Sequence, residues 1–313
     1  MNGLVVVAFG GNASYPPNIR GSAEEQLQLM HRACRHLAAI MRSGYRLLVT
    51  HGNGPVVGNI LFRMARSAKE LPPMPMDICV AHSQGGMGYM LQQTLGNVLR
   101  DEGMNSAVAS VLTQVEVDAG DAAFAQPSKP VGRFFAAEEA ERLEREHGWR
   151  FAQDAGRGFR RIVPSPAPMR ILEIEAIRAL LSANVLPIAV GGGGIPVTRQ
   201  PDGSYKGASA VIDKDHTSAL LAAEVRAETL LMLTGVERVA LDFGTPRERP
   251  LERLSAAEAE RHLNEGQFPP GSMGPKIAAA VRYLRRGGKR VIITSLDRAH
   301  SALLGEGGTT ITP

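Results

Sequence analysis

The chain has 313 residues, of which 44% are hydrophobic and 21% are charged, an ordinary globular composition that allows a sizeable core. Its 35 Lys and Arg residues against 31 Asp and Glu residues give a net charge of +4, and no run of five basic residues occurs. Because only 5% of the residues are aromatic, base-stacking surfaces are not expected. The composition therefore argues against a nucleic-acid partner and favours a site for small anionic molecules.

Cysteine usage and hydropathy restrict the class of protein further. Cys34 and Cys79 are the only cysteines, so neither a disulfide framework nor a zinc site is expected. The first apolar run stops at Gly10 without a preceding basic segment, and no apolar run approaches 18 residues. We therefore expect a cytoplasmic protein with no membrane span.

The first part of the chain alternates between apolar runs and helical patterns. A capping box at Ser22 and Glu25 opens the first helical pattern, and Gly44 ends it. The order strand, helix, strand is typical of a parallel sheet with helical crossovers. The elements predicted here are strands at 4–9, 47–50 and 108–114 and helices at 22–44 and 77–100.

The alternation lapses between about residue 118 and residue 162. Charge is dense at 138–146, and Gly and Pro are scattered through 126–133. We interpret this stretch as a protruding subdomain inserted over the edge of the sheet. Two roles stay open on composition alone, a lid over the site or a surface insertion that only adds area.

Alternation resumes in the last part of the chain. We expect strands at 187–190, 210–212, 229–233 and 291–293, helices at 171–181 and 218–224, and helix starts at the capping box 255–258 and at 277. The whole pattern predicts a single domain over residues 1–313. Its fold class is a three-layer α/β/α sandwich with a mainly parallel central sheet.

Three of the predicted strands are followed by glycine-rich loops. Since the carboxyl ends of parallel strands meet at one edge of a sheet, these loops should lie together where such sheets bind ligands. Backbone amides in glycine-rich loops bind phosphate well. None of the loops matches the Walker pattern or the dinucleotide fingerprint, so a nicotinamide dehydrogenase is disfavoured. The loops contain Gly10-Gly11-Asn12, Gly52-Asn53-Gly54 and Gly191-Gly192-Gly193-Gly194.

Three lysines are candidates for contacts with phosphate. Lys214 stands between two carboxylates, Lys276 follows a Gly-Pro pair at a predicted helix start, and Lys129 lies in the protruding stretch. Each could instead be a surface ion pair or a solvated lysine. Together with the glycine loops, and with no Ser/His/Asp arrangement evident, they predict phosphoryl transfer by alignment and charge neutralisation.

With these motifs assembled, the sequence resembles the carbamate kinases of the amino-acid-kinase family. The resemblance spans the whole chain in the family's order. The matching stretches are 10–13, 51–55, 83–85, 113–118, 154–158 with Arg160 and Arg161, 163–166, 191–196, 211–215, 267–268 and 271–276.

The resemblance implies a role for each candidate residue. Lys129 would reach the substrate, Lys214 and Lys276 would stabilise the transferring phosphoryl group, and Asp215 would orient the lysines. The carbamoyl and phosphate groups would lie among Gly10, Gly11, Asn12, Gly52, Asn53, Gly54, Gly192 and Gly193. The nucleotide would lie across Thr234, Gly235, Val236, Met273 and Gly274.

The resemblance also implies a reaction. Carbamoyl phosphate and ADP would exchange a phosphoryl group reversibly to give ATP and carbamate, in nitrogen or arginine catabolism. Mg²⁺ would be held mainly by the nucleotide phosphates rather than by protein ligands, and the protein would be a homodimer. Five residues depart from the family pattern: Val56, His82, Gly86, Ser14 and Gly235. They leave two alternatives open, a kinase for another small carboxylate or carbamate-like acid, and a non-catalytic nucleotide-binding regulator.

Overall fold

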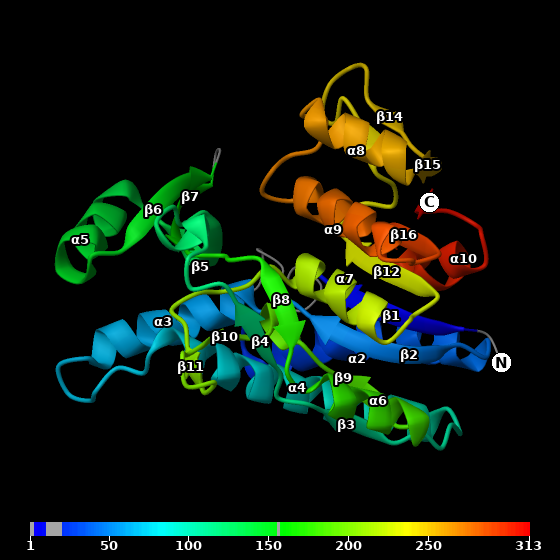
Figure 1. Cartoon of the computed structure of the whole chain (residues 1–313), viewed down its shortest axis with the longest axis horizontal. Coiled ribbons are helices and arrows are strands. Elements are labelled where there is room, and N and C mark those ends of the chain that lie inside the picture. The colour runs from blue at the N-terminus through cyan, green and yellow to red at the C-terminus, as the bar shows by residue number, and fades with distance from the viewer. Residues whose placement is uncertain (1–2, 11–20, 155–156) are drawn as a thin grey trace.

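A computed structural model of the chain describes residues 3–10, 21–154 and 157–313; Gly11 and Asn12 therefore lie outside the described residues. In this part of the chain a central sheet of eight strands has the order β15-β17-β16-β12-β1-β2-β9-β3 (Figure 1). Its strands are β1 (Leu4–Phe9), β2 (Arg46–His51), β3 (Val108–Ser110), β9 (Leu186–Ile188), β12 (Thr229–Thr234), β15 (Arg253–Ser255), β16 (Arg290–Ser295) and β17 (Thr309–Thr312).

Strand pairing confirms the predicted parallel sheet. Every neighbouring pair from β3 to β16 is parallel, and β17 runs antiparallel to β16 at one side. Val5 to Phe9 of β1 are all buried, as expected for a parallel strand that is covered on both faces. Val6 and Ala8 belong to one apolar cluster, and Val5, Val7 and Phe9 belong to another.

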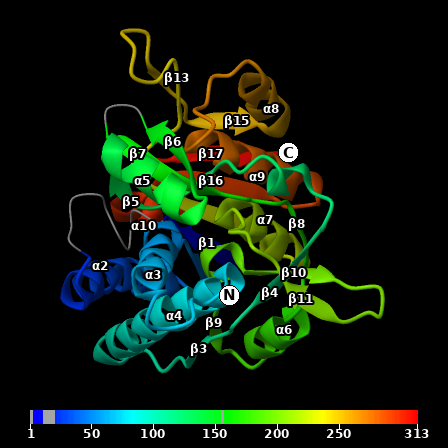
Figure 2. The same cartoon turned by 90° about the vertical axis from the view of Figure 1, so that its left-hand side faces the viewer.

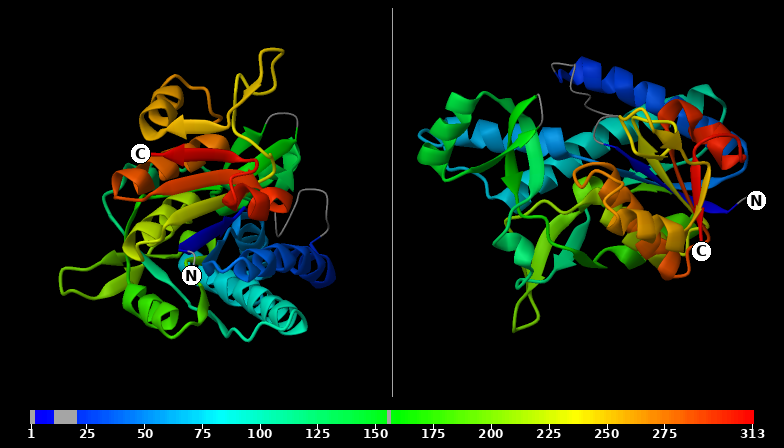
Figure 3. Two further views of the ribbon diagram at one scale, coloured as in Figure 1. Left: turned by 90° about the vertical axis from the view of Figure 1, so that its right-hand side faces the viewer. Right: turned by 90° about the horizontal axis from the view of Figure 1, so that it is seen from above.

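Helices cover both faces of the sheet, so the predicted three-layer sandwich is confirmed (Figure 3). On one side pack α2 (Ala23–Arg42), α4 (Met76–Asp101) and α10 (Ala299–Leu303). On the other side pack α6 (Ile174–Ser182), α7 (Lys214–Glu224), α8 (Ala256–Asn264) and α9 (Met273–Arg285). Both predicted capping boxes form, at the starts of α2 and α8.

Several element boundaries differ from the sequence prediction. The expected strand at 108–114 is two strands, since β4 (Gln114–Val117) joins a second sheet with β8 (Pro168–Ile171), β10 (Ile195–Arg199) and β11 (Tyr205–Gly207). Residues 210–212 are a loop rather than a strand. The helix α7 begins at Lys214 rather than Ser218, because the side chain of Asp213 accepts the backbone N–H groups of residues 215 and 216.

The stretch expected to protrude contains a small sheet of its own. The strands β5 (Lys129–Phe135), β7 (Gly158–Val163) and β6 (Arg150–Asp154) are antiparallel, and α5 (Ala137–His147) packs on them. These four elements, called the protruding unit below, stand apart from the central sheet in Figure 1, with α3 (Gly54–Ser67) next to β5 in Figure 2. A lid role for this unit stays a prediction.

The unit contacts α3 through two glycines. A Cβ on Gly58 would lie 2.1 Å from both the Cα and the N of Gly132, whose φ is +75°. Glycine at both positions thus permits the backbones of α3 and β5 to touch.

The remaining elements are short. They are η1 (Ala122–Phe124), η2 (Gly191–Gly193), β13 (Ala240–Leu241), β14 (Arg249–Pro250) and η3 (Leu296–Arg298). No helix in the described ranges has the length and apolar content that a bilayer crossing requires.

Candidate active site

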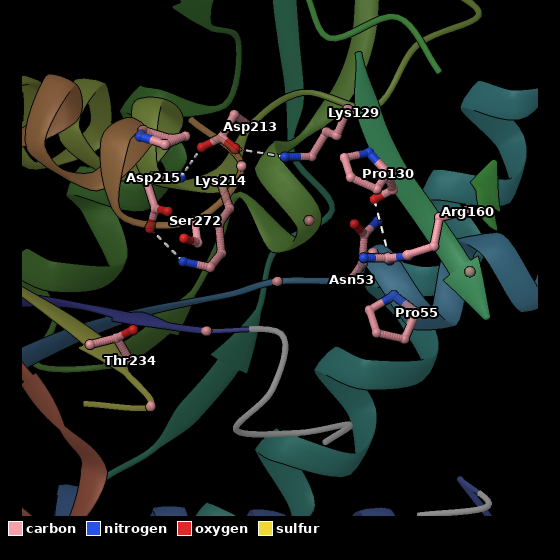
Figure 4. Close-up of a pocket in the computed structure, with 18 of the residues that line it drawn as sticks. Asn53, Pro55, Lys129, Pro130, Arg160, Asp213, Lys214, Asp215, Thr234 and Ser272 are labelled. Atoms are coloured by element: carbon pink, nitrogen blue, oxygen red, sulfur yellow. Dashed lines mark hydrogen bonds and ion pairs between the residues drawn. The ribbon is translucent and has the colours of Figure 1, made fainter. Parts of the chain in front are cut away.

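Four adjacent parallel strands, β12, β1, β2 and β9, carry the predicted loops at their carboxyl ends. Gly10 follows β1, Gly52 follows β2, Gly191 lies beyond β9, and Thr234 ends β12. The prediction that the glycine loops share one edge of the sheet is confirmed. A cavity of about 800 Å³ opens at this edge, between the sheet and the protruding unit (Figure 4).

The cavity brings together most of the sequence-predicted site residues. Those that line it are Gly10, Gly52, Asn53, Gly54, Lys129, Gly192, Lys214, Asp215, Thr234, Gly235 and Lys276. Four further predicted residues are immediate neighbours of lining residues but do not line the cavity themselves: Gly193, Val236, Met273 and Gly274.

Two lysines share one aspartate at the floor of the cavity. Asp215 Oδ1 lies 2.5 Å from Lys214 Nζ, and its Oδ2 lies 3.1 Å from Lys276 Nζ. Lys214 and Asp215 are the first residues of α7, and Lys276 lies in the first turn of α9, which packs against α7. The three groups therefore come from rigid elements, and Asp215 holds both ammonium groups in place.

Burial shifts the pKa values of the ionisable side chains in this group. Burial lowers the pKa of Lys214, although the neighbouring Asp215 opposes that shift. Burial alone would raise the pKa of Asp215, but the charges of Lys214 and Lys276 outweigh it, and the pKa lies below its ordinary value. We infer a buried carboxylate that is ionised because two cations face it.

Lys129 extends from β5 of the protruding unit toward α7. Its Nζ lies 2.6 Å from Asp213 Oδ2. A dashed line marks this ion pair in Figure 4. Burial would raise the pKa of Asp213, but Lys129 holds it well below the usual range of a carboxyl group. Asp213 thus links the protruding unit to the helix that carries Lys214.

The cavity has a strong excess of positive charge. Among the described residues that line it there are seven cations and two carboxylates, Asp213 and Asp215, a difference of five charges. Such a site suits ligands with several negative charges. The cations are Arg32, Lys129, Arg133, Arg157, Arg160, Lys214 and Lys276.

The arginines of the protruding unit were not predicted as cavity residues. Arg133 is stacked on two rings, with its Cζ 4.9 Å from the Phe62 ring centroid and 4.2 Å from that of Phe135. Its guanidinium also pairs with Glu139, 2.5 Å away. Arg157 and Arg160 flank the first residues of β7, and their only sequence signal was the matching stretch around them.

Of the departures from the family pattern, Gly235 lines this cavity, whereas Val56, His82 and Gly86 do not, and Ser14 lies outside the described residues. Val56 is half-buried and packs against the apolar cluster that contains Val5 and Val7. Gly86 is exposed on α4, and a Cβ added to it would meet no heavy atom within 4 Å. Neither residue is part of the cavity lining.

The fold and the site define the class of protein. Residues 3–295 match the amino acid kinase family, and the chain belongs to that family. It is 45% identical over 311 residues to a protein of Pyrococcus horikoshii named carbamate kinase, covering 99% of both chains. It is 46% identical over 314 residues to the Escherichia coli carbamate kinase-like protein YahI, again covering 99% of both.

Solved structures of carbamate kinases also superpose closely on this chain. Carbamate kinase from Giardia lamblia bound to AMP-PNP superposes with a TM-score of 0.91 at 39% identity, covering 99% of this chain and 98% of that one. The same Giardia enzyme bound to citric acid superposes with a TM-score of 0.94. This chain therefore shares the fold of these enzymes.

Proposed function

We propose that this chain is a carbamate kinase, which transfers a phosphoryl group reversibly between carbamoyl phosphate and ADP to give ATP and carbamate. One observation carries the proposal: Lys214 and Lys276 are held by one buried carboxylate where the glycine loops of four parallel strands meet. The full-length similarity to proteins named carbamate kinase supports the choice of substrate.

The mechanism relies on charge and alignment. Negative charge in phosphoryl transfer spreads over the oxygens of the group in flight, so the protein must neutralise it and hold donor and acceptor in line. Lys214 and Lys276 supply two positive charges whose positions are fixed before substrate binds. Because these charges need not reorganise, they stabilise the transition state more than mobile lysines would.

The substrates would occupy different parts of the cavity. We assign the nucleotide to Thr234, Gly235 and Val236 beyond β12 and to Met273 and Gly274 at the start of α9. The position of Thr234, Gly235 and Ser272 in the cavity lining supports this assignment. So does the existence of an AMP-PNP complex of the Giardia relative.

We assign carbamoyl phosphate to the loops beyond β1, β2 and β9. Gly10, Gly52, Asn53, Gly54 and Gly192 line this part of the cavity, and Lys129 reaches it from the protruding unit. Gly193, whose carbonyl accepts a hydrogen bond from Thr217 Oγ1 at 2.8 Å, follows Gly192 in the same loop, and Gly11 and Asn12 complete the proposed set by sequence.

Magnesium belongs to the same proposal. Within the described residues no group of three or more His, Cys, Asp or Glu side chains could hold a metal ion. Asp213 and Asp215, the carboxylates of the cavity lining, are each paired with lysine. These residues fit an Mg²⁺ ion carried mainly by the nucleotide phosphates, which is common in kinases, and not a dedicated protein cage.

Three further properties rest on the resemblance. They are a homodimeric assembly and a role in nitrogen or arginine catabolism, which follow from the resemblance alone, and a cytoplasmic location, which was also expected from the cysteine usage and hydropathy. Sedimentation of the purified protein would test the first of them.

A kinase for another small carboxylate or carbamate-like acid is the second candidate. The E. coli relative, which is 46% identical, is named carbamate kinase-like, and this name is compatible with a different substrate. The place of Val56 outside the cavity lining favours carbamoyl phosphate, because the departure does not reshape the walls. A non-catalytic regulator is disfavoured, since Lys129, Lys214, Asp215 and Lys276 are all present and all line the cavity.

The deciding experiment is ATP formation from ADP and carbamoyl phosphate with Mg²⁺, using the Lys214→Ala variant as the blank. We expect ATP formation that depends on Lys214. A folded protein that binds ADP but makes no ATP would contradict the proposal and favour another acyl phosphate, to be tested next with acetyl phosphate.

A further inference from the structure

Two buried polar side chains of α4 lie behind the cavity, and the mechanism above does not use them. Ser83 is 1% exposed and Gln84 is 4% exposed. Buried polar groups of this kind are costly unless they are fully hydrogen-bonded. Their partners are therefore informative.

Gln84 joins the four-glycine loop to the crossing between β3 and β4. Its Nε2 donates to the carbonyl of Gly191 at 2.9 Å and to that of Thr113 at 3.2 Å. Its Oε1 accepts from the backbone N–H of Thr113 at 2.9 Å. A side-chain amide is needed here, because it can donate to two carbonyls and accept from an N–H at once.

The loop that Gln84 holds begins with a strained residue. Val190 has φ 46° and ψ 36°, the left-handed region that β-branched residues rarely adopt. Its backbone N–H donates to Thr113 Oγ1 at 3.0 Å. Such a conformation persists only where the surroundings enforce it, and Thr113 and Gln84 supply these contacts.

Ser83 holds the opposite loop. Its Oγ accepts from Asn53 Nδ2 at 2.8 Å and donates to the carbonyl of Val80 at 2.6 Å. Asn53 in turn lies against the glycine loop, so closely that a Cβ on Gly192 would be 2.1 Å from Asn53 Nδ2. Consecutive residues of one helix therefore fix two neighbouring loops, which follow the adjacent strands β2 and β9 and contact each other.

We propose that Ser83 and Gln84 are positioning residues, which set the spacing between the loop beyond β2 and the loop beyond β9 and so align carbamoyl phosphate with the nucleotide. The role in turnover rests on the proposed function. The role in holding the loops does not, and it can be measured without any turnover. Neither side chain lines the cavity, so neither is assigned a contact with substrate.

The main test is the Gln84→Met variant, which keeps the length of the side chain but removes the three hydrogen bonds. Gln93→Met is its matched control, since Gln93 is an exposed glutamine of the same helix whose side chain bonds Tyr89 at the surface. Misplacement of reacting groups by about 1 Å can cost on the order of a hundredfold in rate, so we expect kcat to fall by about 10- to 100-fold. KM for ADP should change by less than about twofold, because β12 and α9 remain in place and uniform binding is retained.

The second readout is amide hydrogen exchange at residues 189–195. We expect faster exchange there in Gln84→Met than in the wild type and in Gln93→Met, because the loop loses its restraints. Unchanged exchange in this segment together with unchanged kcat would overturn the proposal. If the wild type makes no ATP, the proposed function fails, and faster exchange in Gln84→Met alone would still support the positioning role.

Ser83→Ala is the variant least prone to disturb the helix, because alanine has the higher helix propensity. Gly85→Ala is its control, since an added Cβ at Gly85 meets nothing within 4 Å. Loss of the bond to Asn53 should lower kcat by about tenfold, as expected for one buried hydrogen bond, with ADP affinity retained. Equal kcat in Ser83→Ala and Gly85→Ala would contradict the role of Ser83, including in the case that Gln84→Met fails to fold.

Discussion

The molecule contains two lysine–aspartate arrangements that differ in how the chain holds them. At the floor, the side chains of Lys214 and Asp215 are 11% and 5% exposed. At the junction with the protruding unit, those of Lys129 and Asp213 are 20% and 21% exposed. The floor group is part of the core, whereas the second pair joins two bodies of structure.

The apolar clusters that hold the two arrangements in place also differ. The helices α7 and α9 that carry the floor group share a large apolar cluster, which includes Ala219 and Ile277. The protruding unit has its own small cluster around Phe135 and Leu143. The floor thus holds two preorganised cations, and at the junction the protruding unit supplies a third cation, Lys129.

The largest effect should come from the floor. Replacing Lys214 by alanine removes one charge that faces the transferring group, while Asp215 keeps Lys276 as its partner. We expect kcat to fall by roughly two to three orders of magnitude, as for loss of one transition-state contact. Steady-state kinetics with Lys206→Ala as the control, an exposed lysine of β11, would measure it. Near-normal turnover in a folded Lys214→Ala protein would remove Lys214 from the mechanism.

The free energy of unfolding should depend on pH through His51, a buried residue near Lys214. Burial lowers the pKa of His51, at the end of β2, to about 4, and Lys214 adds to this shift while a hydrogen bond to the Gly52 carbonyl opposes it. In the unfolded chain a histidine titrates near pH 6.5, so between about pH 6.5 and 4 the unfolded state binds more protons. Stability is therefore lost as the pH falls through this window, by about 3 kcal/mol at most for this one group.

Urea unfolding at pH 7 and pH 4.5 would measure that loss. The proteins to compare are the wild type, His51→Gln and His82→Gln; His82 is an exposed residue of α4 and serves as the control. The His51 variant should lose less stability on acidification than the other two proteins. His216, whose pKa burial also lowers, is present in all three and cancels in the comparison. An identical pH dependence in the two variants would contradict the assignment to His51.

At the junction, Lys129→Ala should weaken the binding of only one of the two substrates. Lys129 reaches the part of the cavity that we assign to carbamoyl phosphate, and a contact between charged groups contributes about 1.5–3 kcal/mol. We expect KM for carbamoyl phosphate to rise about tenfold or more, with KM for ADP changed less than about twofold. Lys69→Ala, at an exposed site, serves as the control. An effect confined to ADP would contradict the proposed place of Lys129 over the acyl phosphate.

Local patterns were enough to predict the sheet edge that holds the site. Gly10 and Gly191 each follow a fully apolar run, and Gly52 comes shortly after the apolar residues 47–49; such runs are typical of buried parallel strands. The break in the strand at 108–114 could not be predicted in this way. Thr113 leaves the sheet to bond Gln84, 29 residues earlier in the chain, and no local spacing encodes that contact.

The protruding unit was the least predictable region for a different reason. Its strands do not alternate cleanly between buried and exposed residues; five consecutive residues of β7, 158–162, are half-buried. A strand of this kind has no period of two in its hydrophobicity, so only the lapse of the earlier pattern was visible. For the same reason the sequence did not predict that Arg133 would line the cavity.

The smallest effect should come from Val56, which lies next to a substrate loop but is half-buried and packs against the core. Val56 is in the first turn of α3, two residues beyond Gly54, and packs against the apolar cluster on the α2 side of the sheet. We expect Val56→Gln to change KM for carbamoyl phosphate by less than about threefold, while burying a glutamine without matched partners lowers the melting temperature. Ile60→Gln, one turn further along α3 and also half-buried, controls for a general loss of stability. A large gain in affinity for carbamoyl phosphate in Val56→Gln would show that position 56 acts on the substrate in spite of its packing, and would favour a different natural acyl substrate for this chain.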